Sequence, residues 1–328
     1  MKPKISVVVP VYNVAPYLRP CMDSLTNQTL RNIEVIAIND NSLDNSQRIL
    51  EEYAAQDNRI RVINNPVNQK TAIVRNTGLR YARGEYVSFI DGDDYLDLDF
   101  CEKLFELAKR EDADIAKGLT KTFQQDGSIH TASDNNTIKK SKFNFLGHLL
   151  SAIYRRSMVE KHQIRFHIDF FCFQIQAAYW ANNIACRDDV YYNYIRHEGS
   201  CDSDVFTLEK WQRLNLGHAN FIFNWVNSHE YAPDIKEKYL AFVRWLYFYG
   251  YNKLDTVDIL SGAIILANTM RENYDCGYNV QNIVKLRRKL FCKHKKVTLL
   301  KYLQHRASEQ PLCQWIIKPI KAFASSMK

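Results

Sequence analysis

Residues 84–94 read GEYVSFIDGDD, an apolar run that ends in three carboxylates within four positions. The run Tyr86–Asp91 is typical of a strand buried on both faces of a parallel sheet. Gly92 lets the backbone after the strand approach a ligand closely. Carboxylates at this spacing repel each other unless a cation lies among them, and Mg²⁺ and Mn²⁺ bind through one or two carboxylates plus phosphate oxygens. The stretch therefore predicts a strand with a metal site at its end; a solvated Asp-Gly turn is the alternative.

Strand and helix patterns alternate on both sides of this stretch. They predict, in chain order, strand Ile5–Val11, helix Pro16–Asn27, strand Ile33–Ile38, helix Ser42–Gln56 capped by Ser42 or Asp44, strand Arg59–Asn64, helix Gln69–Ala82, helix Leu98–Arg110 and strand Ala113–Thr120. Strands separated by helices of this length indicate βαβ units. The sequence therefore predicts an α/β fold around a mostly parallel sheet.

Polar residues follow three of these strands, as Tyr12-Asn13, Asn39-Asp40-Asn41 and residues 91–94. Right-handed crossovers bring the carboxyl ends of parallel strands to one edge, where open α/β sheets bind ligands. We therefore expect the three clusters to converge. A carboxylate such as Asp40 accepts hydrogen bonds from a base or a ribose hydroxyl, or caps the next helix. Arg75, on a helix that flanks this edge, binds phosphate or forms a surface ion pair.

The remainder of the chain is less regular. We predict a hairpin or flexible loop at Phe123–Thr137, helices at Phe143–Lys161 and Asp169–Ala181, and a strand at Val190–Ile195. From about Thr207 the pattern is helical, which places a domain boundary near residue 205. The aromatic residues at helical spacing in this part are typical of contacts between helices.

Charge is unevenly distributed along the 328 residues. The net charge is +8, yet residues 285–328 hold 12 Lys or Arg against one acid, so this tail carries +11 and residues 1–284 carry −3. Basic clusters alternate there with apolar runs, which predicts a helix docked on an anionic membrane surface. A solvated basic face is the alternative. We expect no nucleic-acid partner, because no binding motif accompanies the charge.

Composition narrows the class of protein. With 46% hydrophobic and 24% charged residues, the chain is globular rather than disordered or fibrous. We find neither a membrane-spanning apolar run nor a secretory signal, so we expect a cytoplasmic protein, peripheral on the inner face of the cytoplasmic membrane. The eight cysteines include no Cys-x-x-Cys pair, which predicts free thiols rather than disulfides or a zinc site.

Four sequence blocks together resemble the family 2 glycosyltransferases of the GT-A fold. They are ISVVVPVYN at 5–13, INDNSLD at 38–44, AIVRNTG at 72–78 and GEYVSFIDGDD at 84–94. The resemblance is strong over residues 4–120 and weaker to about 202. It implies a Rossmann-like domain at 1–205, with a nucleotide-sugar-binding half at 1–120 and an acceptor-side half at 121–205, followed by a helical region at 206–328.

The resemblance also implies an activity and its residues. The enzyme would invert the anomeric centre of a nucleotide-diphospho-sugar, with UDP as the favoured nucleotide, and would use Mn²⁺ or Mg²⁺. Asp93 would ligate the metal, with Asp91 and His197 beside it; a structural role is the alternative for His197. The nucleotide sugar would be held by Pro10, Tyr12, Asn13, Asp40, Arg75, Asp91 and Gly92.

The catalytic base is the position at which the sequence departs from the family. The family carries Glu-Asp there and uses the Asp, whereas Asp169-Phe170 stand in register here. We predict that Asp169 takes over as base; a helix cap is its alternative. Asp188-Asp189 are weaker candidates that we expect to form a turn, and we expect His167 to contact the acceptor.

The expected acceptor is a growing, lipid-linked glycan of a bacterial cell surface, such as lipopolysaccharide or capsule. This expectation rests on the family resemblance and on the basic tail. A catalytically impaired nucleotide-sugar-binding protein is one alternative, since Phe170 replaces the usual base. A nucleotidyltransferase is the other, although the loop after the first strand is not a Gly-rich phosphate loop.

Overall fold

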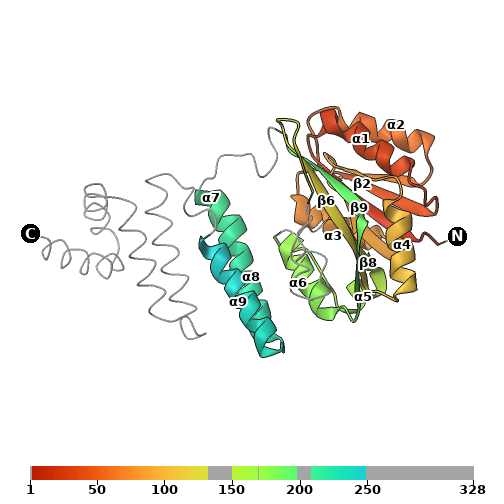
Figure 1. Cartoon of the computed structure of the whole chain (residues 1–328). Helices are drawn as coiled ribbons and strands as arrows, with labels where there is room; N and C mark the ends of the chain where they lie inside the picture. Colours follow the sequence, from red (N-terminus) through yellow and green to blue (C-terminus); the bar gives the residue numbers. More distant parts are fainter. Residues whose placement is uncertain (1, 132–149, 169, 198–207, 249–328) are drawn as a thin grey trace, which may run out of the picture. The chain divides into compact units, whose positions relative to one another are not determined.

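The computed structural model describes residues 2–131, 150–168, 170–197 and 208–248 (Figure 1). Strands and helices alternate through its first part, in the order β1 (Ile5–Val11), α1 (Ala15–Thr26), β2 (Ile33–Asn39), α2 (Ser46–Gln56), β3 (Ile60–Asn64), α3 (Thr71–Tyr81), β4 (Tyr86–Phe89), β5 (Tyr95–Leu96) and α4 (Phe100–Arg110). The α/β class predicted from the sequence is confirmed.

The second part supplies the remaining strands and the later helices. Its elements are β6 (Ile115–Phe123), β7 (Ile129–Thr131), β8 (Ala152–Arg155), α5 (Arg156–Lys161), α6 (Phe170–Trp180), β9 (Ile184–Ile195), α7 (Leu208–Trp211), a π-helical turn (Gln212–Leu216), α8 (Gly217–Ser228) and α9 (Pro233–Phe248). The hairpin predicted from Phe123 is confirmed as far as Thr131, because β7 pairs with β6.

Within the described residues, one sheet runs in the order β3-β2-β1-β4-β8-β6-β9-β5, with β7 paired to β6. β1 pairs in parallel with β2 and β4, β2 with β3, and β6 with β9. β8 is antiparallel to both of its neighbours, so β4 and β6 point the same way. The carboxyl ends of β1, β2, β4, β6 and β9 therefore share one edge of the sheet.

Helices bury both faces of the sheet, as the apolar run of β1 predicts. Val7 and Val9 face a core formed with α1, α2 and α4, whereas Val8 faces a second core formed with α3, α5 and α6. All three valines are fully buried. Burial of alternate residues on opposite faces explains why this strand has no polar alternation.

Two local predictions are wrong. The helix expected at Phe143–Lys161 is a strand at Ala152–Arg155, because these residues pair between β4 and β6, and only Arg156–Lys161 is helical. The helix expected from Ser42 begins at Ser46, after Asn45, and Asp44 Oδ1 accepts the amide of Ser46 (3.0 Å) from two residues earlier. Residues 143–149 lie outside the described part of the chain.

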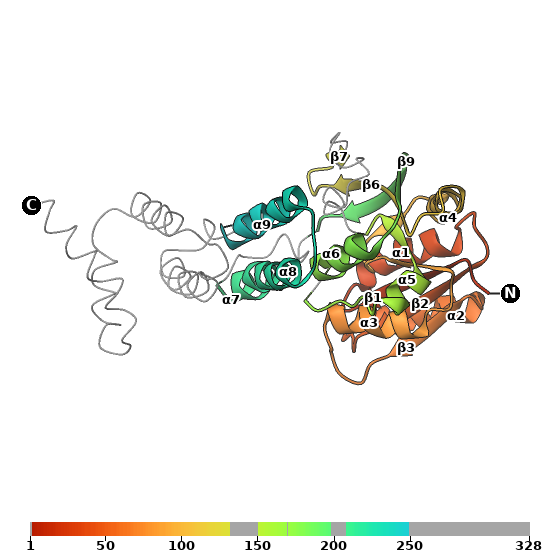
Figure 2. The same cartoon turned by 90° about the horizontal axis from the view of Figure 1, so that it is seen from below.

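The helices α8 and α9 lie side by side (Figure 1, Figure 2). Aromatic rings join α8 to α6: Phe171 lies 5.3 Å from His218, and Tyr179 lies 6.0 Å from Trp225, between ring centroids. Residues 213–248 accordingly group with residues 1–205 in one compact unit. The boundary at 205 stays a prediction, because the basic tail at 285–328 and much of 206–328 lie outside the described residues.

In the described part of the chain, no helix has both the length and the apolar composition that crossing a membrane requires. The described cysteines Cys21, Cys101, Cys172 and Cys186 are free thiols, as predicted.

Candidate active site

The three polar clusters predicted from the sequence meet at the carboxyl edge of the sheet. The backbone amide of Asn13 donates to Ser42 Oγ (3.1 Å), and the amide of Leu43 donates to Asn13 Oδ1 (2.8 Å), so the loops after β1 and β2 are tied together. A Cβ atom at Gly92 would lie 3.3 Å from the carbonyl oxygen of Pro10, so the turn after β4 lies against the end of β1. The predicted convergence is confirmed.

Asp40 is engaged by its own chain. Its side chain is 3% exposed. Oδ1 accepts from Asn65 Nδ2 (2.7 Å) and from the amide of Gln69 (2.9 Å), and Oδ2 accepts from the amides of Gln69 and Lys70 (both 3.0 Å). These bonds hold the loop that leads into α3. The role of Asp40 toward a nucleotide base stays a prediction.

Arg75 is buried on α3 and not on the surface. Its side chain is 4% exposed, and Nη2 forms an ion pair with Asp91 Oδ1. The guanidinium also lies 5.7 Å from the centroid of the Phe166 ring. Because Asp91 is about one-third exposed, Arg75 compensates this carboxylate from the protein side while the carboxylate still meets solvent. The surface ion-pair interpretation of Arg75 is wrong.

Asp93 contacts His197, which lies just beyond the carboxyl end of β9. Asp93 Oδ2 lies 3.0 Å from His197 Nε2, and the imidazole stacks on the ring of Tyr17, with centroids 4.0 Å apart and planes at 19°. Burial and the neighbouring carboxylate of Asp91 raise the pKa of Asp93, and the bond to His197 opposes this rise. A bound cation would relieve the electrostatic cost of these carboxylates.

Asp94 ties the turn to β9. Its side chain is 1% exposed, accepts from the hydroxyl of Tyr192, and accepts at Oδ1 from the amide of Ile195 (2.8 Å). The amide of Asp91 in turn donates to the hydroxyl of Tyr192 (3.2 Å). Burial, Asp93 and Asp91 raise the pKa of Asp94 well above its usual range. Asp94 thus fixes the strand end that carries His197.

Comparison with known proteins now assigns the family. The model of glycosyl transferase family 2 matches residues 6–181. The chain belongs to this family. Its sequence is 34% identical to EpsH of Bacillus subtilis over 60% of this chain and 62% of EpsH. It is 36% identical to the poly(ribitol-phosphate) beta-glucosyltransferase of Bacillus spizizenii, over 36% of this chain and 19% of that relative. The chain thus spans less than two thirds of these curated relatives.

Solved structures show the same GT-A fold. TarS of S. aureus, residues 1–349 in complex with UDP-GlcNAc, matches with a TM-score of 0.67 and 22% identity over 81% of each chain. The mannosyltransferase PcManGT of Pyrobaculum calidifontis, in complex with GDP-Man and Mn²⁺, matches with a TM-score of 0.55 and 15% identity over 90% of this chain and 82% of that one. The mostly parallel sheet and its helices therefore form a glycosyltransferase fold of family 2.

The donor atoms of this family 2 site suit a hard divalent ion. No group of three His, Cys, Asp or Glu side chains placed to hold a metal occurs within the described ranges. Asp93 and His197 supply one carboxylate oxygen and one imidazole nitrogen 3.0 Å apart, and Asp91 precedes them on the same turn. Mg²⁺ and Mn²⁺ accept so few protein ligands when phosphate oxygens and water complete the shell. The residues fit a metal held jointly with a diphosphate.

The other predicted residues lie as follows. Tyr12 is 46% exposed beside Asn13, so its ring is accessible at the site. His167 is exposed, and its ring centroid lies 4.9 Å from that of Phe221 on α8. Asp169 lies outside the described residues, and α6 begins at Phe170. Asp188 and Asp189 lie within β9 rather than in a turn.

Asp189 is engaged by neighbouring cations. Its carboxylate pairs with Arg187 (2.6 Å) and with Lys103 (3.4 Å) on the surface. The guanidinium of Arg187 holds its pKa below the usual range of an aspartate. This carboxylate is fully compensated, which distinguishes it from Asp93.

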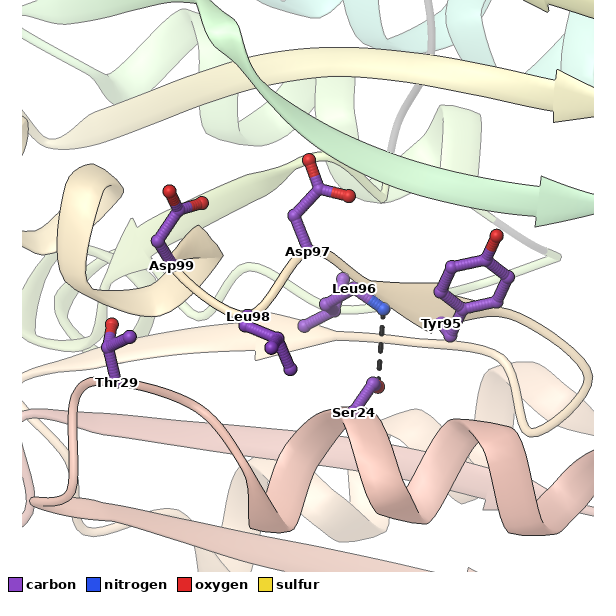
Figure 3. A pocket seen from close by; sticks show the side chains of 7 residues that line it. All are labelled: Ser24, Thr29, Tyr95, Leu96, Asp97, Leu98 and Asp99. Atoms are coloured by element: carbon purple, nitrogen blue, oxygen red, sulfur yellow. Dashed lines mark hydrogen bonds between the residues drawn. The ribbon is translucent and has the colours of Figure 1, made fainter.

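A separate cavity of about 510 Å³ lies beside β5 (Figure 3). It is lined by Ser24, Thr29, Tyr95, Leu96, Asp97, Leu98 and Asp99. Its acids are engaged, since Asp97 accepts from Asn193 (2.9 Å) and Asp99 pairs with Lys103 (2.8 Å). None of the residues predicted to bind the nucleotide sugar lines this cavity.

Sequence reasoning missed Tyr17, Tyr192 and the tying role of Asp94. The strand pattern at Val190–Ile195 could have indicated Tyr192. This strand ends just before His197, in the same way as the first strand ends just before Tyr12. The sequence holds no signal that pairs Tyr17 with His197, since contacts over 180 positions depend on how the strands are ordered in the sheet.

Proposed function

We propose that the chain is a metal-dependent, inverting glycosyltransferase. It would move a sugar from a UDP-sugar to a hydroxyl of a growing bacterial cell-surface glycan, of the lipopolysaccharide or capsule type. The observation that carries this proposal is the pair of Asp93 and His197 at the carboxyl edge of the sheet, next to Asp91. Carboxylates that the protein compensates only in part are suited to a cation that arrives with a diphosphate.

The similar proteins support parts of this proposal. The two structures with the same fold were solved with UDP-GlcNAc and with GDP-Man and Mn²⁺, which supports a nucleotide-sugar donor and a divalent ion. The poly(ribitol-phosphate) beta-glucosyltransferase acts on a polymer of ribitol phosphate according to its name, which supports a hydroxyl of a polymer as the acceptor. UDP is favoured because the TarS structures contain UDP-GlcNAc and UDP.

Each proposed role has a physical basis. When bound, Mn²⁺ or Mg²⁺ would offset the charge that develops on the departing diphosphate. Asp93 and His197 would hold the ion, and Arg75 would keep Asp91 in place through their ion pair. Tyr12 would stack on the base. Asp169 would accept the proton of the acceptor hydroxyl, which attacks the anomeric carbon from the side opposite the diphosphate.

Binding and turnover of the purified chain test this function. We expect UDP-GlcNAc or UDP-glucose to raise the unfolding temperature in the presence of Mn²⁺, because a ligand that binds only the folded state stabilises it. The variant Asp169→Asn should keep this shift and lose transfer. Binding without any turnover in the unmodified chain would indicate an impaired nucleotide-sugar-binding protein. The absence of any shift with UDP-sugars and GDP-mannose would contradict the proposal.

The cytoplasmic location and the docking of residues 285–328 on an anionic membrane remain part of the proposal. Removing these residues should weaken sedimentation with phosphatidylglycerol vesicles and leave the Mn²⁺-dependent temperature shift unchanged. Vesicles of phosphatidylcholine alone are the control, because they lack the negative charge. Equal sedimentation of the full and the shortened chain would contradict the docking role.

A further inference from the structure

We propose that Tyr17 is a positioning residue of the metal site. Its ring would hold the imidazole of His197 in the orientation that places Nε2 next to the carboxylate of Asp93. The inference rests on the proposed function, because the pair of Asp93 and His197 is useful to the reaction as a cation ligand set. Neither the sequence blocks nor the residues predicted for the site include Tyr17 in this role.

The geometry of the rings carries the inference. The Tyr17 and His197 centroids lie 4.0 Å apart with planes at 19°, which is a face-to-face stack. The bond from Nε2 to Asp93 Oδ2 lies at the edge of the same imidazole. The bond to Asp93 sets the direction of the ring, and the stack sets its plane. Together they present one nitrogen and one oxygen, 3.0 Å apart, toward a shared ligand.

Tyr17 itself is firmly placed. It lies in the first turn of α1, where its amide and that of Leu18 both donate to the carbonyl of Val14, at 2.9 and 3.0 Å. His197 lies two residues beyond the end of β9, after Arg196, whose amide donates to the carbonyl of Phe123 (2.9 Å). The first turn of α1 thus lies against the segment after β9, and the stacked rings of Tyr17 and His197 form the contact between them.

A purely structural role for the Tyr17 ring is less consistent with its surroundings. Among the described residues, the two apolar core clusters include Leu18, which is fully buried, but not Tyr17. The ring of Tyr17 is half-buried at the sheet edge that carries the site. Its stacking contact is with a proposed metal ligand. Residues that orient a metal ligand commonly affect metal affinity by 10-fold or more when they are changed.

The test measures Mn²⁺ affinity without turnover. The free Mn²⁺ signal in electron paramagnetic resonance is followed while the full chain is titrated in the presence of UDP. Tyr17→Leu should weaken Mn²⁺ binding by about 10-fold, whereas Tyr17→Phe, which keeps the ring, should match the unmodified chain. Tyr81→Leu is the control, since Tyr81 is a partly exposed tyrosine on α3 whose ring lies against Arg61.

A double-mutant cycle with His197→Ala distinguishes positioning from general damage to the fold. If Tyr17 acts through His197, Tyr17→Leu should cause no further loss of Mn²⁺ affinity once His197 is alanine. An additive loss in the double variant, or equal affinity of Tyr17→Leu and the unmodified chain, would overturn the inference. A chain that binds no Mn²⁺ even when unmodified would instead overturn the proposed metal dependence, and this role with it.

Discussion

Two carboxylate sites flank the end of β1, and they differ in how their charge is compensated. Asp40 follows β2 on one side, and the turn with Asp91, Asp93 and Asp94 follows β4 on the other. Asp40 is surrounded by donors of its own chain, namely two backbone amides and one side-chain amide. The turn gathers three carboxylates, and the pKa values of Asp93 and Asp94 are raised.

This contrast distinguishes a carboxylate that its own chain compensates from the carboxylates that are proposed to bind a cation. Hydrogen bonds to Asp40 stabilise the loop before α3 without any ligand. Asp93 and Asp94 cost free energy in the isolated protein, because burial and repulsion by neighbouring carboxylates disfavour their charged forms. Removing a carboxylate should therefore destabilise the fold at Asp40 and should not do so at Asp93.

The largest effect is expected from Asp93→Asn. We expect sugar transfer to fall by about 1,000-fold, equivalent to about 4 kcal/mol of barrier, because the leaving diphosphate loses its cation. The free energy of unfolding should stay equal or rise, since one repelling charge is removed. Initial rates and urea unfolding measure the two quantities. Asp189→Asn, which alters a compensated surface carboxylate, should leave transfer unchanged; a comparable loss there would contradict the assignment.

Asp40→Ala should show the opposite pattern. Three partly buried donors lose their acceptor, so we expect the free energy of unfolding to fall by about 3 kcal/mol. Asn65→Ala removes only one of these donors and should cost about 1 kcal/mol. Urea unfolding at neutral pH measures both variants. If Asp40→Ala were as stable as the unmodified chain, the four hydrogen bonds would not exist in solution.

The extent to which this contrast could be predicted from the sequence depends on the range of the contacts. The convergence of the three polar clusters was predictable, because strand polarity and right-handed crossovers follow from the βαβ pattern. The donors to Asp40 were not, since residues 65–70 carry no periodic signal. The position of Tyr17 against His197 required knowing that β9 ends near the turn after β4, and this depends on the order of the strands in the sheet.

The strand β8 shows the same limit in the fold. Ala152–Arg155 adjoins a helical segment, and its local pattern favoured one long helix. Its pairing with β4 and β6 decides the outcome, and these partners lie more than 30 residues away. Short segments are most often misassigned where long-range pairing outweighs local preference.

Lys117 extends the comparison to a buried cation. Its side chain on β6 is 2% exposed, and burial lowers its pKa to about 8, against a small opposing influence of Cys186. The folded state binds this proton more weakly than the unfolded chain does, so the buried charge lowers the free energy of unfolding. This loss is at its full size below pH 8 and disappears as the pH rises toward 10.5.

Lys117→Met should therefore stabilise the protein in a pH-dependent manner. We expect its gain in unfolding free energy over the unmodified chain to shrink by about 2 kcal/mol between pH 7 and pH 9.5. Urea unfolding at the two pH values gives this difference. The tyrosines contribute equally to both proteins, so their titration cancels. Lys121→Met, on the same strand and partly exposed, is the control. A gain that is independent of pH would contradict the buried cation.

Asn13 provides the smallest test, at the loop that separates the two carboxylate sites. Its φ of 53° is left-handed, and its Oδ1 accepts the amide of Leu43 at an exposed position. Asn13→Gly removes the hydrogen bond but accepts this φ, whereas Asn13→Ala also meets the strain of the left-handed region. We expect the alanine variant to unfold more easily than the glycine variant by about 1 kcal/mol. Equal stability of the two would contradict the left-handed φ of residue 13, because alanine would then meet no strain at this position of the loop between the two carboxylate sites.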